Sequence, residues 1–236
     1  MAEGDTTGSA QRRHEDRSLP AGSFSSWVVD MQTAIRGRGG SDVPCDGCTA
    51  CCTSSQFVHI EPDEIDTLSH IPAELLFPAP RRPRGHMLLG YDERGHCPML
   101  IEDQCSIYEH RPSTCRTYDC RVFPATGIDV DATMVSIGRR TRRWQFDFPA
   151  PADRIRHDAV RAAAAFIDDR TEVLPGAGKP NATQRAVLAI DVHDAFLANV
   201  EGHDDDGDGD DLVVIEPDPD VIRTEITRRT RGHPST

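Results

Sequence analysis

The sequence has one lysine, few aromatic residues and no long apolar run. Lys179 is the single lysine among 236 residues, so arginine supplies nearly all of the positive charge. Asp and Glu number 39 against 26 Lys and Arg, and the formal net charge is −13. Phosphate backbones repel a protein of this charge, so we expect no sequence-independent binding of nucleic acid.

Membrane-spanning and secretory signals are missing as well. Nowhere do about 18 apolar residues run together, as a membrane span requires. The first residues, "MAEGDTTGSAQRRHEDRSLPAGS", contain no apolar segment of the kind found in secretory signals. We therefore expect a soluble, cytoplasmic protein with no membrane partner.

Three common catalytic signatures are absent. The chain has no G-x-S-x-G nucleophile elbow, no P-loop and no G-x-G-x-x-G dinucleotide motif. These absences weaken the hypothesis of an enzyme that binds a nucleotide-like donor. They do not exclude it, because donor sites can be built in other ways.

Cysteine, in contrast, is abundant and clustered. The eight cysteines follow the pattern C-x2-C-x2-C-C, then 44 residues, then C-x7-C-x9-C-x4-C, and all fall between Cys45 and Cys120. A chain of this length can bury a core without disulfides, and cytosolic thiols stay reduced unless they bind metal or carry out redox chemistry. The clustering therefore favours metal ligation over cross-linking.

The first cluster, "CDGCTACC", has metal-ligand spacing. Two cysteines separated by two residues can place both sulfurs on one ion, and this applies to Cys45 with Cys48 and to Cys48 with Cys51. Cys51 and Cys52 are neighbours, which usually project in different directions. Two sites, or one polynuclear site, are therefore expected.

The type of metal stays open between zinc and iron. A cage of four cysteines suits zinc, whereas C-x2-C-x2-C followed by a remote Cys-Pro, here Cys97-Pro98, is also the pattern of bacterial ferredoxins. The adjacent Cys52 departs from the ferredoxin pattern. We rank zinc or mononuclear iron ahead of an iron–sulfur cluster.

Residues 43–125 closely resemble the YkgJ-like cysteine-cluster family, described as a putative zinc- or iron-chelating domain. The resemblance lies in the C-x2-C-x2-C-C run and in the segments "CPML", "CSIY" and "RPSTCR". It implies metal ligation by Cys45, Cys48, Cys51, Cys52, Cys97, Cys105 and Cys115. Cys120 belongs to "YDC", where the family pattern differs, and its role as an eighth ligand is left open. Some members are associated with lysine N-methylation of flagellin, which would need a methyl-donor site.

Arginines and histidines near the cysteines are further candidates for the metal site. Arg111, Arg116 and Arg121 flank the second cysteine cluster and could stabilise thiolates, or else pair with nearby acids. His96 and His110 could ligate or act as bases, but surface or core roles are favoured.

The acidic segment "DDDGDGDD" almost fits a calcium-binding loop. Asp204, Asp206, Asp208 and Gly209 suit an EF-hand, but its twelfth position is Ile215 instead of glutamate. We therefore expect a solvated acidic loop. Without its six aspartates the chain carries −13 + 6 = −7 charges.

The expected fold class is α+β, a small cysteine-rich metal-binding domain with flanking helices. We divide the chain into a disordered tail (1–22), a helix and linker (23–42), the cysteine domain (43–125) and a strand-and-helix extension (126–236) with an acidic loop at 201–211. The local patterns predict helices at 24–35, 153–170, 181–200 and 219–231, strands at 56–60, 144–148 and 212–215, and a hairpin of 87–91 with 96–100.

Three functional hypotheses follow. The first is a metal-binding protein that chelates zinc or iron through cysteine thiolates. The second is an enzyme, either an iron-dependent oxidoreductase or a protein methylase, which would need an open coordination position or a donor pocket. The third is a protein whose metal fastens the fold while the C-terminal helices bind a protein partner.

Overall fold

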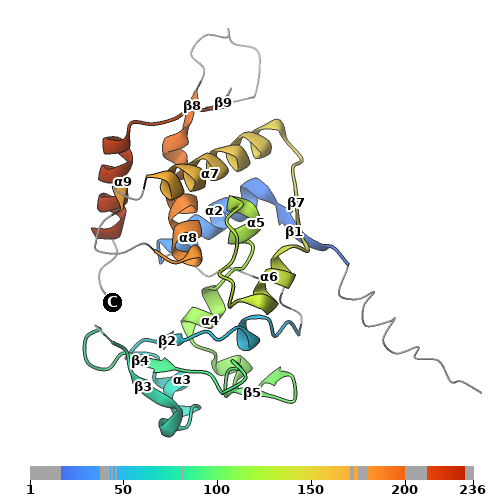
Figure 1. Cartoon of the computed structure of the whole chain (residues 1–236), viewed down its shortest axis with the longest axis vertical. Coiled ribbons are helices and arrows are strands. Elements are labelled where there is room, and N and C mark those ends of the chain that lie inside the picture. Colours follow the sequence, from blue (N-terminus) through green and yellow to red (C-terminus); the bar gives the residue numbers. More distant parts are fainter. Residues whose placement is uncertain are drawn as a thin grey trace, which may run out of the picture.

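The computed structural model describes residues 17–37, 43, 45, 47–80, 82–170, 173–174, 180–199 and 212–231. The disorder expected for 1–16 and the acidic loop 201–211 lie outside these residues. Helices and several short sheets make up the described chain, so the α+β class is confirmed (Figure 1). Among the described residues, no helix is both long enough and apolar enough to cross a bilayer.

A helical part forms the larger core. Its main helices are α2 (Phe24–Ile35), α5 (Val122–Thr126), α7 (Pro151–Asp169), α8 (Ala182–Val192) and α9 (Pro219–Arg231). The apolar stripe of α7 is buried at Ala159, Ala163 and Ile167. It packs against α2, α5 and α8, as the helical periodicity of the sequence indicates (Figure 1).

A parallel pair of strands closes one side of this core. Strand β1 (Leu19–Ser23) runs beside β7 (Trp144–Asp147), with Leu19 opposite Trp144. The division that assigned 1–22 to a disordered tail is therefore wrong for its last residues. The error has a physical cause: the short segment "LPAGS" carries no period of its own and becomes a strand only through its pairing with β7, since Leu19 lies opposite Trp144, 144 − 19 = 125 residues later.

Helix α8 begins where the sequence predicts and ends earlier. Asn181 Oδ1 accepts a hydrogen bond from Gln184 N at 2.9 Å, and Asn181 N donates to Gln184 Oε1 at 3.0 Å, which completes the expected capping box. The predicted extension to Val200 is wrong. A 3-10 turn (His193–Phe196) follows the helix, and β8 (Leu197–Asn199) then pairs antiparallel with β9 (Leu212–Val214).

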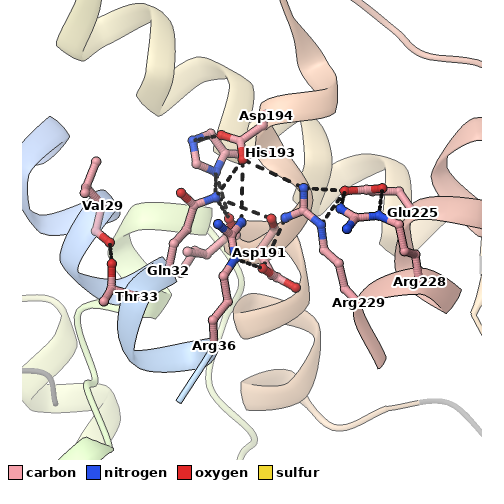
Figure 2. A network of polar contacts seen from close by, with 11 residues as sticks. Val29, Gln32, Thr33, Arg36, Asp191, His193, Asp194, Glu225, Arg228 and Arg229 are labelled. Carbon is pink, nitrogen blue, oxygen red and sulfur yellow. Dashed lines mark hydrogen bonds and ion pairs between the residues drawn. The ribbon is translucent and has the colours of Figure 1, made fainter. Parts of the chain in front are cut away.

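Side-chain contacts of α8 join it to its helical neighbours. Asp191 Oδ1 accepts from Nε of Arg36, the C-cap residue of α2, at 3.3 Å and from Arg229 Nη1 of α9 at 3.1 Å. Gln32 of α2 donates to the carbonyl of Ile190 at 3.2 Å. Figure 2 shows Arg36 and Arg229 converging on Asp191 at the end of α8, and together these contacts join α2, α8 and α9.

The smaller part, in the lower half of Figure 1, contains a three-stranded sheet. The strand order is β2 (Val58–Ile60), β4 (Met87–Leu89), β3 (Leu76–Pro78), and both pairs are antiparallel. The hairpin predicted between 87–91 and 96–100 is wrong, because β4 lies between two earlier strands. Its apolar residues pack with α3 (Ile65–Ser69) in a separate small core around Ile60, Ile71, Leu89, Met99 and Ile107.

Candidate metal centre

The eight cysteines come from loops and short elements between the two parts. Cys51 and Cys52 open the 3-10 turn η1 (Cys51–Thr53), Cys105 ends β6 (Gln104–Cys105) and Cys115 lies in α4 (Ser113–Thr117). The others lie in connecting segments: Cys45, Cys48, Cys97 and Cys120. All eight are free thiols.

A glycine turn brings Cys45 and Cys48 together. Gly47 has φ of 70°, a left-handed conformation that glycine adopts without steric cost. The turn is closed by a hydrogen bond from Cys48 N to Cys45 O at 2.7 Å. The two thiols also interact electrostatically, because Cys48 is the second cause, after burial, of the raised pKa of Cys45.

The adjacent cysteines of η1 have different neighbours. Successive residues of a 3-10 helix are about 120° apart, so Cys51 and Cys52 point in different directions. Burial raises the pKa of Cys51 well above its ordinary value, and the next largest cause is the charge of Cys120. Burial also raises the pKa of Cys52 to about 12, but there the next causes are Cys97 and Cys105.

These electrostatic neighbours divide the cysteines into two quartets. The first quartet comprises Cys45, Cys48, Cys51 and Cys120. The second comprises Cys52, Cys97, Cys105 and Cys115. The quartets adjoin, since Cys52 also interacts with Cys45 and Cys48.

Backbone contacts hold the second quartet in place. Cys97 N donates to Cys52 O at 2.7 Å, which ties the early cluster to the late one. Strands β5 (Leu100–Ile101) and β6 are joined by Glu102 and Asp103, both with positive φ, and the tight turn places Cys105 opposite Leu100. Burial followed by the charge of Cys52 raises the pKa of Cys115 to about 12. Cys115 is at the surface, yet its thiol is largely surrounded by protein.

Donors and cations surround the first quartet. Trp144 Nε1 donates to Cys120 Sγ at 3.2 Å. Burial raises the pKa of Cys120 to about 12, and this hydrogen bond is the main opposing influence. The guanidinium of Arg140 lies over the Trp144 ring at 4.8 Å and lowers the pKa of Cys45. The sequence patterns gave no signal for Trp144 or Arg140, since neither is near a cysteine in the chain.

The three arginines considered from the sequence differ from one another. Arg111 lies 3.5 Å above the Tyr108 ring, and its charge lowers the pKa of Cys45 and of Cys115. Arg116 lies 3.8 Å from Glu64 on the surface. Arg121 forms a 2.8 Å ion pair with Asp119, and this pair is buried rather than at the surface.

The donor chemistry of the quartets fits a thiophilic cation. Four sulfurs form the ligand set of tetrahedral Zn²⁺ and of iron in sulfur coordination. In such a site the sulfurs stand about 3.8 Å apart, as follows from Zn–S bonds of roughly 2.3 Å. Among the described residues, no group of three cysteines has all its sulfurs within 4.8 Å of one another. The sulfurs would therefore move closer together around an ion.

Two histidine–carboxylate groups do have all of their ligand atoms within 4.8 Å of one another. They are His59 with Glu61 and His86, and Asp66 with His70 and His110, each with ligand atoms within 4.8 Å. Of these residues, the sequence pattern indicates only His110 as a candidate ligand. The alternation of His59 and Glu61 along a strand was a weak signal for the first group.

The described chain thus has an α+β fold that brings its eight clustered thiols near one another. Residues 44–136 match a protein-family model named CxxCxxCC and described as "Putative zinc- or iron-chelating domain". The match includes all eight cysteines and confirms the family resemblance predicted from the sequence. No curated protein and no solved structure matches the chain.

Proposed function

We propose that this protein binds zinc or iron through cysteine thiolates at two adjacent sites. One ion is held by Cys45, Cys48, Cys51 and Cys120, and the other by Cys52, Cys97, Cys105 and Cys115. The main support is that eight free cysteines, with the early cluster tied to the late one by the Cys97 N to Cys52 O hydrogen bond, lie in the region that matches the zinc- or iron-chelating family model. In this proposal Cys120 is a full ligand.

In the metal-free protein, burial favours protonated thiols over thiolates. Free thiols with raised pKa values carry protons at neutral pH, and an ion that binds them releases those protons. A bound ion would supply the positive charge that stabilises four thiolates. The Trp144 N–H and the Arg111 guanidinium would then stabilise the negative charge that remains.

Chelation itself is the immediate role that we assign to the two quartets. Four thiolates saturate a tetrahedral ion and leave no open position for a substrate, in contrast to catalytic zinc sites. Eight free thiols belong in a reducing compartment, and we place the protein in the cytoplasm. A protein partner for the C-terminal helices and the absence of nucleic-acid binding stay predictions.

Elemental analysis of anaerobically purified protein, together with an absorbance spectrum, tests the proposal. Thiolate-bound zinc gives stoichiometric metal without colour, mononuclear iron gives colour without inorganic sulfide, and a cluster gives iron with sulfide. We expect metal at these sites in one of the first two forms. Protein that takes up no zinc or iron after reduction of its thiols would contradict the proposal.

Paired substitutions test the assignment of each sulfur. Cys51→Ser with Cys120→Ser should remove one thiolate site and leave the other. Cys51→Ser with Cys52→Ser, two adjacent residues, should damage both sites, because each site loses one ligand. Cys52→Ser with Cys115→Ser is the matched control, which should spare the first site. Equal metal loss in all three double variants would indicate a single polynuclear centre.

A further inference from the structure

The group formed by His59, Glu61 and His86 lies on the small sheet. His59 lies in β2, Glu61 follows directly after the strand, and His59 Nδ1 lies 3.3 Å from Glu61 Oε1. Ile60 pairs with Met87 at the end of the antiparallel ladder, and Glu61 and His86 lie one residue beyond this pair on their two segments. The pairing of β2 with β4 therefore brings His86 next to His59 and Glu61.

A glycine positions His86 next to Glu61. Gly85 has φ of 99°, and a Cβ there would lie 3.0 Å from Pro62 Cβ. Only glycine lets the chain pass this closely to Pro62 in that conformation. The carbonyl of His86 is then fixed by a 2.9 Å hydrogen bond from Ala79 N.

The three side chains meet closely and leave one buried oxygen unpaired. His86 Nδ1 lies 3.1 Å from His59 Nε2 and 3.0 Å from Glu61 Oε2. The side chain of His86 is only 5% exposed. Glu61 Oε2 is buried and accepts no hydrogen bond, because its approach to His86 lacks hydrogen-bond alignment. A buried carboxylate oxygen without a partner is costly, and a cation between the three groups would satisfy it.

The second group, Asp66 with His70 and His110, also has two histidines and one carboxylate. It lacks the burial and the unpaired oxygen of the first group. Asp66 is 70% exposed, and its Oδ2 accepts from His110 Nδ1 at 2.8 Å. The His70 and His110 rings stack with centroids 3.5 Å apart at the surface. This group is satisfied and solvated, and it provides a matched control.

We propose that His59, Glu61 and His86 bind one divalent cation, Zn²⁺ or Fe²⁺, at a site separate from the cysteines. Two imidazole nitrogens and one carboxylate form the ligand set of open zinc and ferrous sites, in which water or another small ligand completes the coordination. His59 and Glu61 are 23% and 28% exposed, so one side of the ion faces solvent. The site is a neighbour of the second quartet, since Thr114 beside Cys115 donates to the carbonyl of His59 at 2.7 Å.

Titration of the metal-free, reduced full-length chain with Co²⁺ distinguishes this site from the thiolate sites. Cobalt bound by cysteine gives sulfur-to-metal charge-transfer absorption, whereas cobalt bound by nitrogen and oxygen gives only d–d bands. We expect one equivalent that adds d–d absorption without charge transfer. Glu61→Gln, which keeps the shape of the side chain, and His59→Asn, at a partly exposed position, should each lose that equivalent alone.

The controls decide the outcome in either direction. Asp66→Asn should bind the same number of equivalents as the unaltered chain, and circular dichroism of each metal-free variant checks that it is folded. The proposal is overturned if folded Glu61→Gln takes up the sulfur-free equivalent as tightly as the unaltered chain, or if Asp66→Asn is the variant that loses it. A missing charge-transfer band would instead count against the thiolate sites, so the two proposals fail separately.

Discussion

The indole of Trp144 donates a hydrogen bond to the sulfur of Cys120 across 3.2 Å, although 24 residues separate them in the chain. Trp144 begins β7, and the ring is buried in the helical core. This contact connects the packing of the larger part to the chemistry of the first quartet. The core thus determines the surroundings of a proposed metal ligand.

Trp144→Phe should weaken metal binding at the first quartet. Phenylalanine keeps an aromatic ring under Arg140 but removes the N–H donor to Cys120, and loss of such outer contacts lowers metal affinity by about 10-fold or more. Competition with a chromophoric chelator measures the affinity of each site. The second quartet serves as the internal control. Unchanged affinity at the first quartet would show that the hydrogen bond does not act on the metal.

Asp119→Asn should destabilise the fold strongly. The Asp119 carboxylate is fully buried and accepts from both Arg121 and the Trp27 indole, the latter at 2.8 Å. Asparagine would remove the negative charge that faces the buried guanidinium of Arg121, at a cost of about 3–5 kcal/mol. Urea unfolding of the metal-free chain measures the change. Arg94→Ala, in an exposed pair with Asp92, is the control and should cost less than about 1 kcal/mol. Similar losses in both variants would contradict the argument.

Gly95→Ala should be destabilising for two separable reasons. Gly95 has φ of 79°, and an added Cβ would overlap the hydroxyl of Ser55, whose backbone N donates to Gly95 O at 2.9 Å. The backbone conformation alone costs about 1–2 kcal/mol for alanine. Combining the change with Ser55→Ala should recover the part due to overlap but not the part due to φ. Unfolding free energies of the three variants form the test, and full recovery in the double variant would be inconsistent with backbone strain.

Glu225 should contribute stability that disappears in acid. Hydrogen bonds from Arg228, and then from Arg229, hold the pKa of its carboxyl at about 2 rather than 4.5. A folded-state pKa below the unfolded one stabilises the fold above about 4.5, and this contribution is lost as the pH falls toward about 2. Glu225→Gln should therefore melt at a lower temperature than the unaltered chain near neutral pH. The gap in melting temperature, measured on both metal-free chains, should narrow in acid. A gap that stays constant through this range would show that Glu225 does not carry the effect.

Local signals predicted the helices well because each helix is encoded by neighbouring residues. Helix α9 covers 219–231 as expected, and the capping box of Asn181 and Gln184 forms at the start of α8. Periodicity and caps act over three or four residues, so they can be read without knowing the fold. The end of α8 was missed because pairing of β8 with β9 replaces the last predicted turns of helix.

Strand partners could not be read in the same way. The run 87–91 matches a hairpin strand by pattern, yet β4 pairs with β2 and β3 instead. Which strands pair depends on the packing of Ile60 and Leu89 in a shared core, and short apolar runs do not specify it.

The sequence by itself determined that the chain has eight thiols in two clusters, a formal net charge of −13 and a set of capped, amphipathic helices. Tertiary structure alone decided that Cys51 and Cys52 have different neighbours, that Trp144 contacts Cys120, and that His86 meets Glu61. The physical reason is the separation along the chain of the residues that create each feature. Composition and helical period are local properties, whereas each of these contacts joins segments that meet only after the loops between them have closed.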